Sequence, residues 1–324
     1  MSVLCYTGLE EVIGLGIRRV SRYGGEYIMG IFRPFLLIPA MPSTIRLDGA
    51  ALASELRAGF KIRVAELARA GRQPGLAVLM AGDNPASQVY VRNKIKSCAE
   101  VGIHSEQQLL PGNVSEVELL ATIATLNVDP RIHGILVQLP LPRHIDEARV
   151  LAAINPEKDA DGFHIENAGA LAQGAPKVVP CTPMGVMRML EKAEVPVEGA
   201  EAVVLGRSNI VGKPMALLLT LANATVAVCH SKTRHLVEHT RRADILISAI
   251  GRPHFITGDM IKKGAVLIDV GINREAETNK ILGDIDDDSC NGIASMISPV
   301  PGGVGPMTIA MLLANTIEAA ARSS

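Results

Sequence analysis

The sequence has no tryptophan, few aromatic residues of any kind and almost no net charge. Its 324 residues include 32 Lys and Arg and 33 Asp and Glu, which gives a formal net charge of −1. This balance gives no electrostatic reason to expect nucleic acid or an acidic molecule as a partner. Hydrophobic residues make up 48% of the chain, so it can bury sizeable cores, and its length suggests about two domains.

The sequence also lacks paired cysteines and long apolar runs. The cysteines are scattered, without a C-x-x-C pair, at Cys5, Cys98, Cys181, Cys229 and Cys290. This spacing is typical of small buried side chains in a reducing compartment and argues against a disulfide framework. No apolar run approaches the roughly 20 residues that span a bilayer. We therefore expect a soluble, cytoplasmic protein that binds no membrane.

Residues 1–40 differ in composition from the rest of the chain. Their arginines are compatible with a transit peptide, but Glu10, Glu11 and Glu26 are unusual in one. A secretory signal is disfavoured because no charged start leads into a clean apolar stretch and a cleavage site. We expect an extension from an upstream start codon, with Met41 or Met29 as the natural start, and poor order in this segment.

From Leu47 onward, helical and strand patterns alternate. In the first half they predict helices at 50–70, 84–101, 114–126 and 146–154 and strands at 75–80 and 134–137. A segment rich in Pro, Gly and Asn, residues 156–183, is predicted to be a loop. In the second half the patterns predict helices at 184–193, 213–222, 233–241 and 307–321 and strands at 201–205, 224–229, 244–249 and 265–270. Such alternation is typical of βαβ units and parallel sheets.

These patterns predict an α/β protein with two domains. The first, residues 41–183, is predicted to contain a parallel sheet. The second, residues 184–306, is predicted to be a Rossmann-type nucleotide-binding domain.

The segment VVLGRSNIVGKPMALLL, Val203 to Leu219, resembles a nucleotide-binding corner. A short apolar strand ends at Gly206, and after Gly212 and Pro214 a helical pattern begins. Strand, glycine turn and helix N-terminus in this order form a cradle for phosphate groups. The glycine spacing is not G-x-G-x-x-G, so an ordinary strand-to-helix connection is the alternative.

The residues after the second strand of this domain indicate the cofactor type. An NAD site places Asp or Glu about 20 residues past the glycine turn, to bind the ribose hydroxyls. Here the segment CHSKT offers His230, Ser231 and Lys232 instead, and Arg207 lies in the glycine turn. Donors and positive charge without a carboxylate suit a 2′-phosphate, so the sequence favours NADP.

A second candidate site lies in the predicted helix at 84–101. Ser87, Tyr90 and Lys94 are spaced so that they share one helix face. A phenol beside an ammonium group in a cleft can assist proton transfer. The alternative is an amphipathic helix whose Tyr and Lys extend along the surface.

Two further segments end in polar side chains. In GILVQLPLP, Gln138 follows an apolar strand at the sheet edge where open α/β sheets bind ligands, although it could simply face solvent. In PEKDADGFH, Asp159 and Asp161 precede a glycine. Asp161 is either an ordinary turn residue or a carboxylate that accepts hydrogen bonds from a heterocycle with an amidine-like N–H edge.

Three other patterns are rejected as sites. His235 and His239 do not form H-E-x-x-H, so a zinc site is disfavoured. The acidic run at 284–288 lacks the central Gly and the closing Glu of a calcium loop. No nucleophile occupies a G-x-S-x-G turn, and no metal is expected.

Together these segments resemble a known family, the bifunctional methylenetetrahydrofolate dehydrogenase/methenyltetrahydrofolate cyclohydrolases. The resemblance covers the chain from about Ile45 to Ala321. It is carried by YVRNKIKSCAEVGI, GILVQLPLP, PEKDADGF, PCTPMGV, VVLGRSNIVGKPM, CHSKT, ADILISAIG, IDVGIN, GDID and SPVPGGVGPMT.

The resemblance implies a role for each candidate residue. Lys94 is expected to be the central catalytic group, Gln138 to hydrogen-bond and tune it, Tyr90 and Ser87 to position the folate, and Asp161 to bind the pterin ring. Arg207 and Ser231 are expected to face the 2′-phosphate, with His230 nearby, while Gly206, Ser208 and Ile272 line the cofactor. The resemblance also implies that residues 41–183 form the catalytic domain, completed by a C-terminal helix at 307–324, and that a cleft separates it from the NADP-binding domain at 184–306. The turn Pro301-Gly302-Gly303 is expected to close over this cleft, and the resemblance implies a homodimer.

The implied reaction has two steps. Oxidation of 5,10-methylenetetrahydrofolate by NADP⁺ requires mainly orientation, whereas hydrolysis of the methenyl product to 10-formyltetrahydrofolate requires a proton carrier. Two alternatives stay open: a dehydrogenase without cyclohydrolase activity, and a catalytically idle nucleotide-binding or scaffold protein.

Overall fold

The computed structural model describes residues 43–275, 278 and 280–323. The chain divides into two units, Met1–Ala40 and Met41–Ser324, and every element described below belongs to the second. The expected upstream extension over residues 1–40 lies outside the described residues.

A three-stranded parallel sheet occupies the first half of the described chain. Its spatial order is β3 (His104–Leu110), β2 (Gly75–Ala81) and β4 (Gly134–Val137). In the central strand, Leu76 and Val78 enter one hydrophobic core while Ala77 and Leu79 enter another. Successive side chains of a strand point to opposite faces of the sheet. An unbroken apolar run therefore gives β2 two apolar faces, and both can pack against other elements.

Five helices accompany this sheet: α1 (Gly49–Arg69), α2 (Pro85–Val101), α3 (Glu116–Val128), α4 (Glu147–Ala152) and α5 (Ile165–Ala172). Four of them, α1, α3, α4 and α5, begin at side-chain caps. Asp48 accepts a hydrogen bond from the backbone N–H of Ala51 at the start of α1, and Ser115 and Glu118 form a capping box at the start of α3. These caps fix the helix starts by satisfying amide groups that have no partner within the helix.

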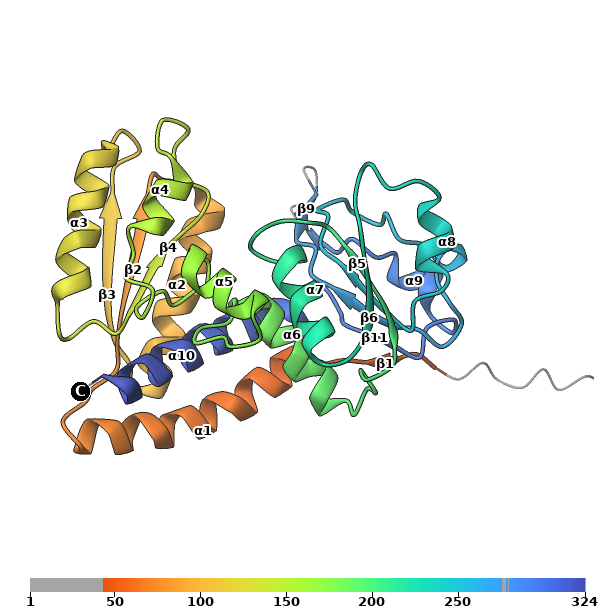
Figure 1. The fold of residues 1–324 in the computed structure, drawn as a ribbon, viewed down its shortest axis with the longest axis horizontal. Coiled ribbons are helices and arrows are strands. Elements are labelled where there is room, and N and C mark those ends of the chain that lie inside the picture. The colour runs from red at the N-terminus through yellow and green to blue at the C-terminus, as the bar shows by residue number, and fades with distance from the viewer. Residues whose placement is uncertain (1–42, 276–277, 279, 324) are drawn as a thin grey trace, which may run out of the picture. The chain divides into compact units, whose positions relative to one another are not determined.

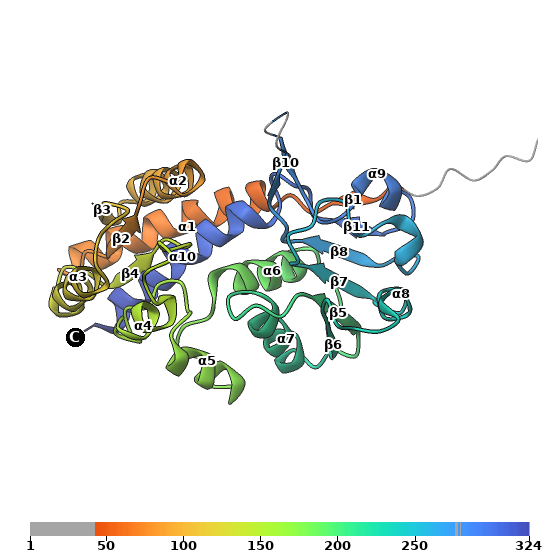
Figure 2. The same cartoon turned by 90° about the horizontal axis from the view of Figure 1, so that it is seen from above.

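A six-stranded sheet, in which every pairing is parallel, occupies the second half (Figure 2). Its spatial order is β1 (Ile45–Arg46), β11 (Met296–Ile297), β8 (Val266–Asp269), β7 (Ile245–Ser248), β5 (Glu201–Leu205) and β6 (Thr225–Cys229). The accompanying elements are α6 (Cys181–Lys192), α7 (Gly212–Leu221), α8 (Leu236–Thr240), a 3₁₀ turn at Gly258–Met260, the antiparallel pair β9 (Asn273–Arg274) and β10 (Ile281–Leu282), and α9 (Asp287–Cys290). A parallel sheet gathers the carboxyl ends of its strands at one edge, where such sheets bind ligands.

The last helix, α10 (Val304–Arg322), packs against α1 and α6, and Figure 1 shows α1 and α10 side by side. Its buried residues belong to a hydrophobic core that also contains Val78 of β2, Val204 of β5 and Ile268 of β8. One core therefore runs from the first sheet to the second. Among the described residues, α10 alone is long and apolar enough to cross a membrane, and its burial in this core gives a structural reason for that composition.

The structure corrects the sequence expectation in several places. The segment 156–183 is not a continuous loop, because it contains α5 and the start of α6. The strand β3 was not predicted, and α10 begins at Val304 rather than at Met307. The short strand β1 pairs with β11 of the second sheet, although in the sequence it directly precedes the elements of the first sheet.

Candidate functional site

The helix α2 presents its predicted polar residues on one face. Ser87 and Lys94 are buried, with 6% and 8% of their surface exposed, and Tyr90 is partly exposed. Burial raises the pKa of the Tyr90 hydroxyl, an effect that Arg274 partly offsets. Lys94 and Tyr90 are therefore inward-facing groups, unlike the solvent-facing side chains of an amphipathic surface helix.

Lys94 has the partner that the sequence predicted. Its Nζ donates a hydrogen bond to Gln138 Oε1 at 3.1 Å. Gln138 Nε2 in turn donates to the carbonyl of Leu139 at 2.8 Å, which fixes the amide with its oxygen toward the lysine. The strand β4 and the helix α2 thus bring together two groups that are 44 residues apart in sequence.

Asp161 lies in the electrostatic range of the same lysine. The pKa of its carboxyl group is raised to about 6. Burial is the main cause of this rise, the positive charge of Lys94 opposes it, and the negative charge of Asp159 adds to it. Gly162, the next residue, has a φ of 78°, and a Cβ at this position would lie 2.6 Å from the nitrogen of Pro180. The glycine therefore permits the tight turn that carries Asp161.

Asp159 holds this turn in place, a role that the sequence analysis did not assign. Its carboxylate accepts hydrogen bonds from the backbone N–H groups of Gly162 and His164 at 3.0 and 2.8 Å, and from Asn167 Nδ2 at 2.9 Å. The sequence signalled the turn itself through the pair Asp161-Gly162, but not the part that Asp159 plays in it. The contribution of Asn167 had no such signal, because it depends on the helix α5.

Two buried thiols lie within electrostatic range of Lys94. The sequence predicted both as small buried side chains. Cys98 follows one helical turn later on α2, and burial raises the pKa of its thiol to about 12. Cys181 begins α6, and burial and the charge of Asp161 raise the pKa of its thiol. Both thiols are therefore neutral near pH 7 and contribute an apolar wall rather than a nucleophile.

The glycine turn after β5 forms a close-fitting corner. Gly206 has a φ of 117°, and a Cβ there would lie 2.4 Å from the carbonyl oxygen of Ala249. A Cβ at Gly212 would lie 2.2 Å from the carbonyl oxygen of Gly206. Ser208 Oγ accepts hydrogen bonds from the N–H groups of Val211 and Gly212. The chain thus reaches the N-terminus of α7 by a path that only glycine can follow at these two points.

The residues predicted to contact the dinucleotide phosphate lie beside this corner. Leu205 pairs with Cys229, so the segments that follow β5 and β6 emerge at the same sheet edge. Arg207 and Ser231 are exposed there. The segment after β6 is compact, since His230 donates its N–H to Thr233 Oγ1 and accepts the N–H of Lys232 at Nδ1.

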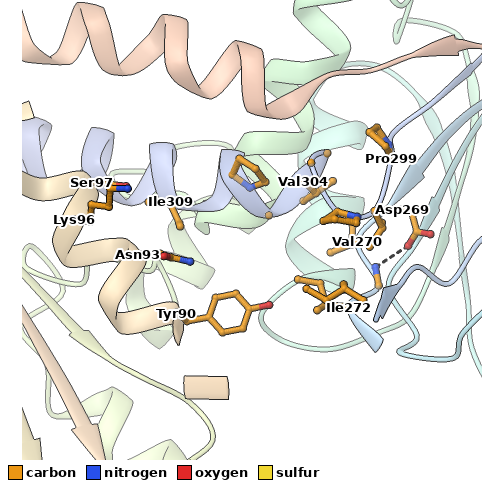
Figure 3. A pocket seen from close by; sticks show the side chains of 18 of the residues that line it. Tyr90, Asn93, Lys96, Ser97, Asp269, Val270, Ile272, Pro299, Val304 and Ile309 are labelled. Carbon is orange, nitrogen blue, oxygen red and sulfur yellow. Dashed lines mark hydrogen bonds between the residues drawn. The ribbon is translucent and has the colours of Figure 1, made fainter. Parts of the chain in front are cut away.

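A cavity of about 400 Å³ lies between α2, α10 and the carboxyl end of β8. Figure 3 shows Tyr90 extending from α2 with its hydroxyl directed toward Ile272. The residues that line the cavity include Tyr90, Asn93, Ile272, Pro301, Gly302 and Gly303. The structure therefore gathers one folate candidate, one cofactor candidate and the predicted closing turn around one space.

Lys94, Gln138 and Asp161 do not line this cavity. They form a separate cluster, and α2 joins the two because Tyr90 and Lys94 are one helical turn apart. Along α2, an amine with a nearby carboxylate thus lies at one point, and a cavity bordered by the carboxyl end of β8 lies one helical turn away.

In the part of the chain that the structure describes, no group of three or more His, Cys, Asp and Glu residues could hold a metal ion. Three carboxylates of the acidic run at 284–288 have protein partners. Asp284 is fully buried, Asp286 caps α9, and Asp287 forms an ion pair with Arg46.

Comparison with known proteins gives consistent matches over both halves of the chain. The family described as tetrahydrofolate dehydrogenase/cyclohydrolase matches through its catalytic domain at residues 47–161 and its NAD(P)-binding domain at residues 180–324. The bifunctional protein FolD of Dechloromonas aromatica is 61% identical over 278 residues, which cover 86% of this chain and 98% of that protein.

Solved structures match equally well. The bifunctional FolD methylenetetrahydrofolate dehydrogenase/cyclohydrolase of Campylobacter jejuni has a TM-score of 0.84 at 49% identity, and the match covers 86% of this chain and 99% of that one. The Trypanosoma brucei enzyme, solved with NADP cofactor and an inhibitor, has a TM-score of 0.84 at 41% identity, and covers 87% and 99%. This chain belongs to the tetrahydrofolate dehydrogenase/cyclohydrolase family.

Proposed function

We propose that this chain is a bifunctional enzyme of one-carbon metabolism. It oxidises 5,10-methylenetetrahydrofolate to the 5,10-methenyl form with NADP⁺ and hydrolyses that product to 10-formyltetrahydrofolate. The observation that carries the proposal is the hydrogen bond between Lys94 and Gln138, one helical turn from a tyrosine that faces the cavity.

The nucleotide corner fits a dinucleotide. Gly206 and Gly212 leave no room for a Cβ, so the backbone can approach a pyrophosphate closely at the N-terminus of α7. Arg207 and Ser231 are exposed at the same edge and can receive the 2′-phosphate. When bound there, NADP⁺ supplies the hydride acceptor of the oxidation.

The first step requires the chain to orient its substrate. Tyr90 provides a flat face beside the cavity, and Asp161 provides a carboxylate for the N–H edge of the pterin. Ser87 lies on the same face of α2. Holding the methylene carbon near the nicotinamide ring supplies the reduction in barrier, since correct placement removes the entropy cost of a bimolecular encounter.

The second step requires proton movement. Water adds to the methenyl carbon, and its oxygen loses both protons as it becomes the formyl oxygen. One proton goes to the ring nitrogen when the bond from this carbon to that nitrogen breaks, and the other is released to solvent. Lys94 is placed to carry the proton, with Gln138 holding its Nζ at 3.1 Å. General acid–base groups of this kind contribute about 10² to 10⁴ in rate.

The test is a coupled assay with 5,10-methylenetetrahydrofolate. Growth of NADPH absorbance followed by decay of the methenyl absorbance is the expected result, and absence of NADPH formation would leave only an idle nucleotide-binding protein. Lys94→Met should reduce cyclohydrolase turnover by about 10² to 10⁴ while NADP binding persists. Lys61→Met, which changes an exposed lysine of α1, is the matched control.

A dehydrogenase without cyclohydrolase activity is the second candidate. It predicts that the methenyl product accumulates without enzymatic decay. The pairing of Lys94 with Gln138 favours the bifunctional reading, because oxidation alone needs no proton carrier at this position.

The proposal extends to organisation and location. Family membership supports a homodimer, and the unpaired cysteines support the cytoplasm. The proposed catalytic domain comprises residues 41–183 with the C-terminal helix 307–324, and the proposed NADP-binding domain comprises residues 184–306. Size-exclusion chromatography with light scattering would test the dimer.

A further inference from the structure

A buried aspartate lies behind the cofactor edge of the six-stranded sheet. Asp284 is 0% exposed and lies between β10 and α9. Its Oδ2 accepts hydrogen bonds from Ser248 Oγ at 3.0 Å, Ile250 N at 2.8 Å and Gly251 N at 3.2 Å, and its Oδ1 accepts from Arg252 N at 2.9 Å and Asn273 Nδ2 at 3.0 Å. One carboxylate therefore receives five donors.

Three of these donors, the N–H groups of residues 250–252, lie in the loop after β7. Ser248 ends β7, and Asn273 begins β9 directly after the loop that follows β8. Residues 249–252 follow β7, and residues 271–273 follow β8. Both loops emerge from carboxyl ends of parallel strands, where α/β sheets bind their ligands. Ile272, which lines the cavity, directly precedes Asn273. Asp284 thus connects the two loops without reaching the cavity lining itself.

The fit around the carboxylate is close. A Cβ at Gly271 would lie 2.2 Å from Asp284 Oδ1, so this glycine allows the second loop to pass against the aspartate. The successive N–H groups of residues 250–252 point at the carboxylate and form a concave anion-binding arrangement of backbone amides. The side chain meets donors alone, and the two oxygens of an aspartate can accept hydrogen bonds from all five.

A second aspartate fixes the backbone that carries the first. Asp269 Oδ1 accepts hydrogen bonds from the N–H groups of Gly271 at 2.8 Å and Asp284 at 3.0 Å, and its Oδ2 accepts from Ile285 N at 2.8 Å. Asp269 is the last residue of β8. The backbone at Asp284 is therefore fixed to the end of β8. The Asp284 carboxylate in turn fixes the loop after β7.

We propose that Asp284 is a positioning residue for the dinucleotide, which sets the loops 249–252 and 271–273 in the arrangement that receives NADP. The proposal rests on the cofactor placement given under Proposed function. Loss of the Asp284 carboxylate should therefore impair the oxidation and spare the hydrolysis of the methenyl compound, because only the oxidation requires the dinucleotide.

The experiment uses Asp284→Asn in the full chain. The amide keeps the shape of the side chain but turns an acceptor into a donor, so some of the five donors lose their partner. The KM for NADP⁺ should rise about tenfold to a hundredfold, while the cyclohydrolase kcat/KM with methenyltetrahydrofolate stays unchanged. Asp286→Asn makes the same chemical change two residues away and keeps a helix cap that Asn also provides, so it should alter neither activity.

A second variant covers the case in which Asp284→Asn does not fold. Asn273→Ala removes only the link from the carboxylate to the second loop, at a partly exposed residue. It should raise the KM for NADP⁺ several-fold without changing hydrolysis. In the double variant the effects should not add, since Asn273 acts through the group that is already altered.

Two results would overturn the proposal. One is an unchanged KM for NADP⁺ in folded Asp284→Asn or, failing that, in Asn273→Ala. The other is a parallel fall of both activities with a lowered Tm, which is what a purely structural role produces. Wild-type protein that does not reduce NADP⁺ would instead refute the proposed function, so the two failures are distinguishable.

Discussion

Asp161 combines a buried carboxyl group with a nearby ammonium group, and its protonation should control folate binding. Burial raises its pKa to about 6, so the group is ionised above this pH and protonated below it. Only the ionised form offers both oxygens to the N–H edge of a pterin. The KM for the folate substrate should therefore rise as the pH falls from 7 to 5, as steady-state kinetics would reveal.

The control for this pH effect is Asp161→Asn, which cannot ionise. Its KM should be high at every pH and should lack the inflection near pH 6. A wild-type KM that does not vary between pH 5 and 7 would show that Asp161 does not bind the folate through its charge.

Arg207 should determine the preference for NADP over NAD. The side chain is exposed beside the glycine turn, and a charge-assisted hydrogen bond to a phosphate contributes about 1.5–3 kcal/mol. Arg207→Ala should therefore weaken NADP binding about tenfold to a hundredfold and leave NAD binding nearly unchanged. Isothermal titration of both dinucleotides provides the measurement.

The exposed Arg63 of α1, paired with Glu66, provides a control of equal charge change. Arg63→Ala should leave both affinities unchanged. Equal losses for NADP and NAD in Arg207→Ala would place Arg207 away from the 2′-phosphate.

At the level of elements, the turn from β5 into α7 should tolerate no side chain at Gly212. A Cβ there would meet the carbonyl oxygen of Gly206 at 2.2 Å, and neither backbone segment can move without displacing the corner. Gly212→Ala should abolish measurable NADP binding and lower the Tm. Gly59→Ala on α1, where nothing lies within 4 Å of the added Cβ, should instead raise the Tm slightly because alanine favours helix.

The elements also show why some of the fold was predictable from the sequence. Strands β2, β5 and β7 are continuous apolar runs buried on both faces, so their composition identifies them. The edge strand β3 reads HSEQQLL and has no fully buried residue. Its register comes from hydrogen bonds to β2, which leave no apolar pattern in the sequence.

The residues of the candidate site also fall into those that the sequence reveals and those that only the structure reveals. Lys94, Tyr90 and Gln138 are marked by side-chain chemistry at positions that one helix or one strand end sets. Asp159 and Asp284 act on backbone amides of other segments, and no local pattern reveals which amides a carboxylate will meet. The role of Asp284 therefore required the structure.

At the scale of the whole described unit, one hydrophobic core crosses from the first sheet to the second. Val78, Val204 and Ile268 belong to it together with much of α10, so the two halves share this core in addition to the separate core that each half contains. We therefore expect a single cooperative thermal transition.

NADP should consequently stabilise both halves although it binds at one sheet. At about one hundred times its Kd, a ligand that binds only the folded state adds about 2.7 kcal/mol, which corresponds to a rise in Tm of about 5 °C for a chain of this size. Circular dichroism should show one transition that moves as a whole, and hydrogen exchange should show added protection at Val78 of β2 as well as at Val204 of β5. Arg207→Ala should lose the effect at both strands at the same NADP concentration. Two separate transitions, only one of which responds to NADP, would mean that the shared core does not couple the two sheets, and the effect of Asp284 on cofactor binding would then be confined to the second sheet.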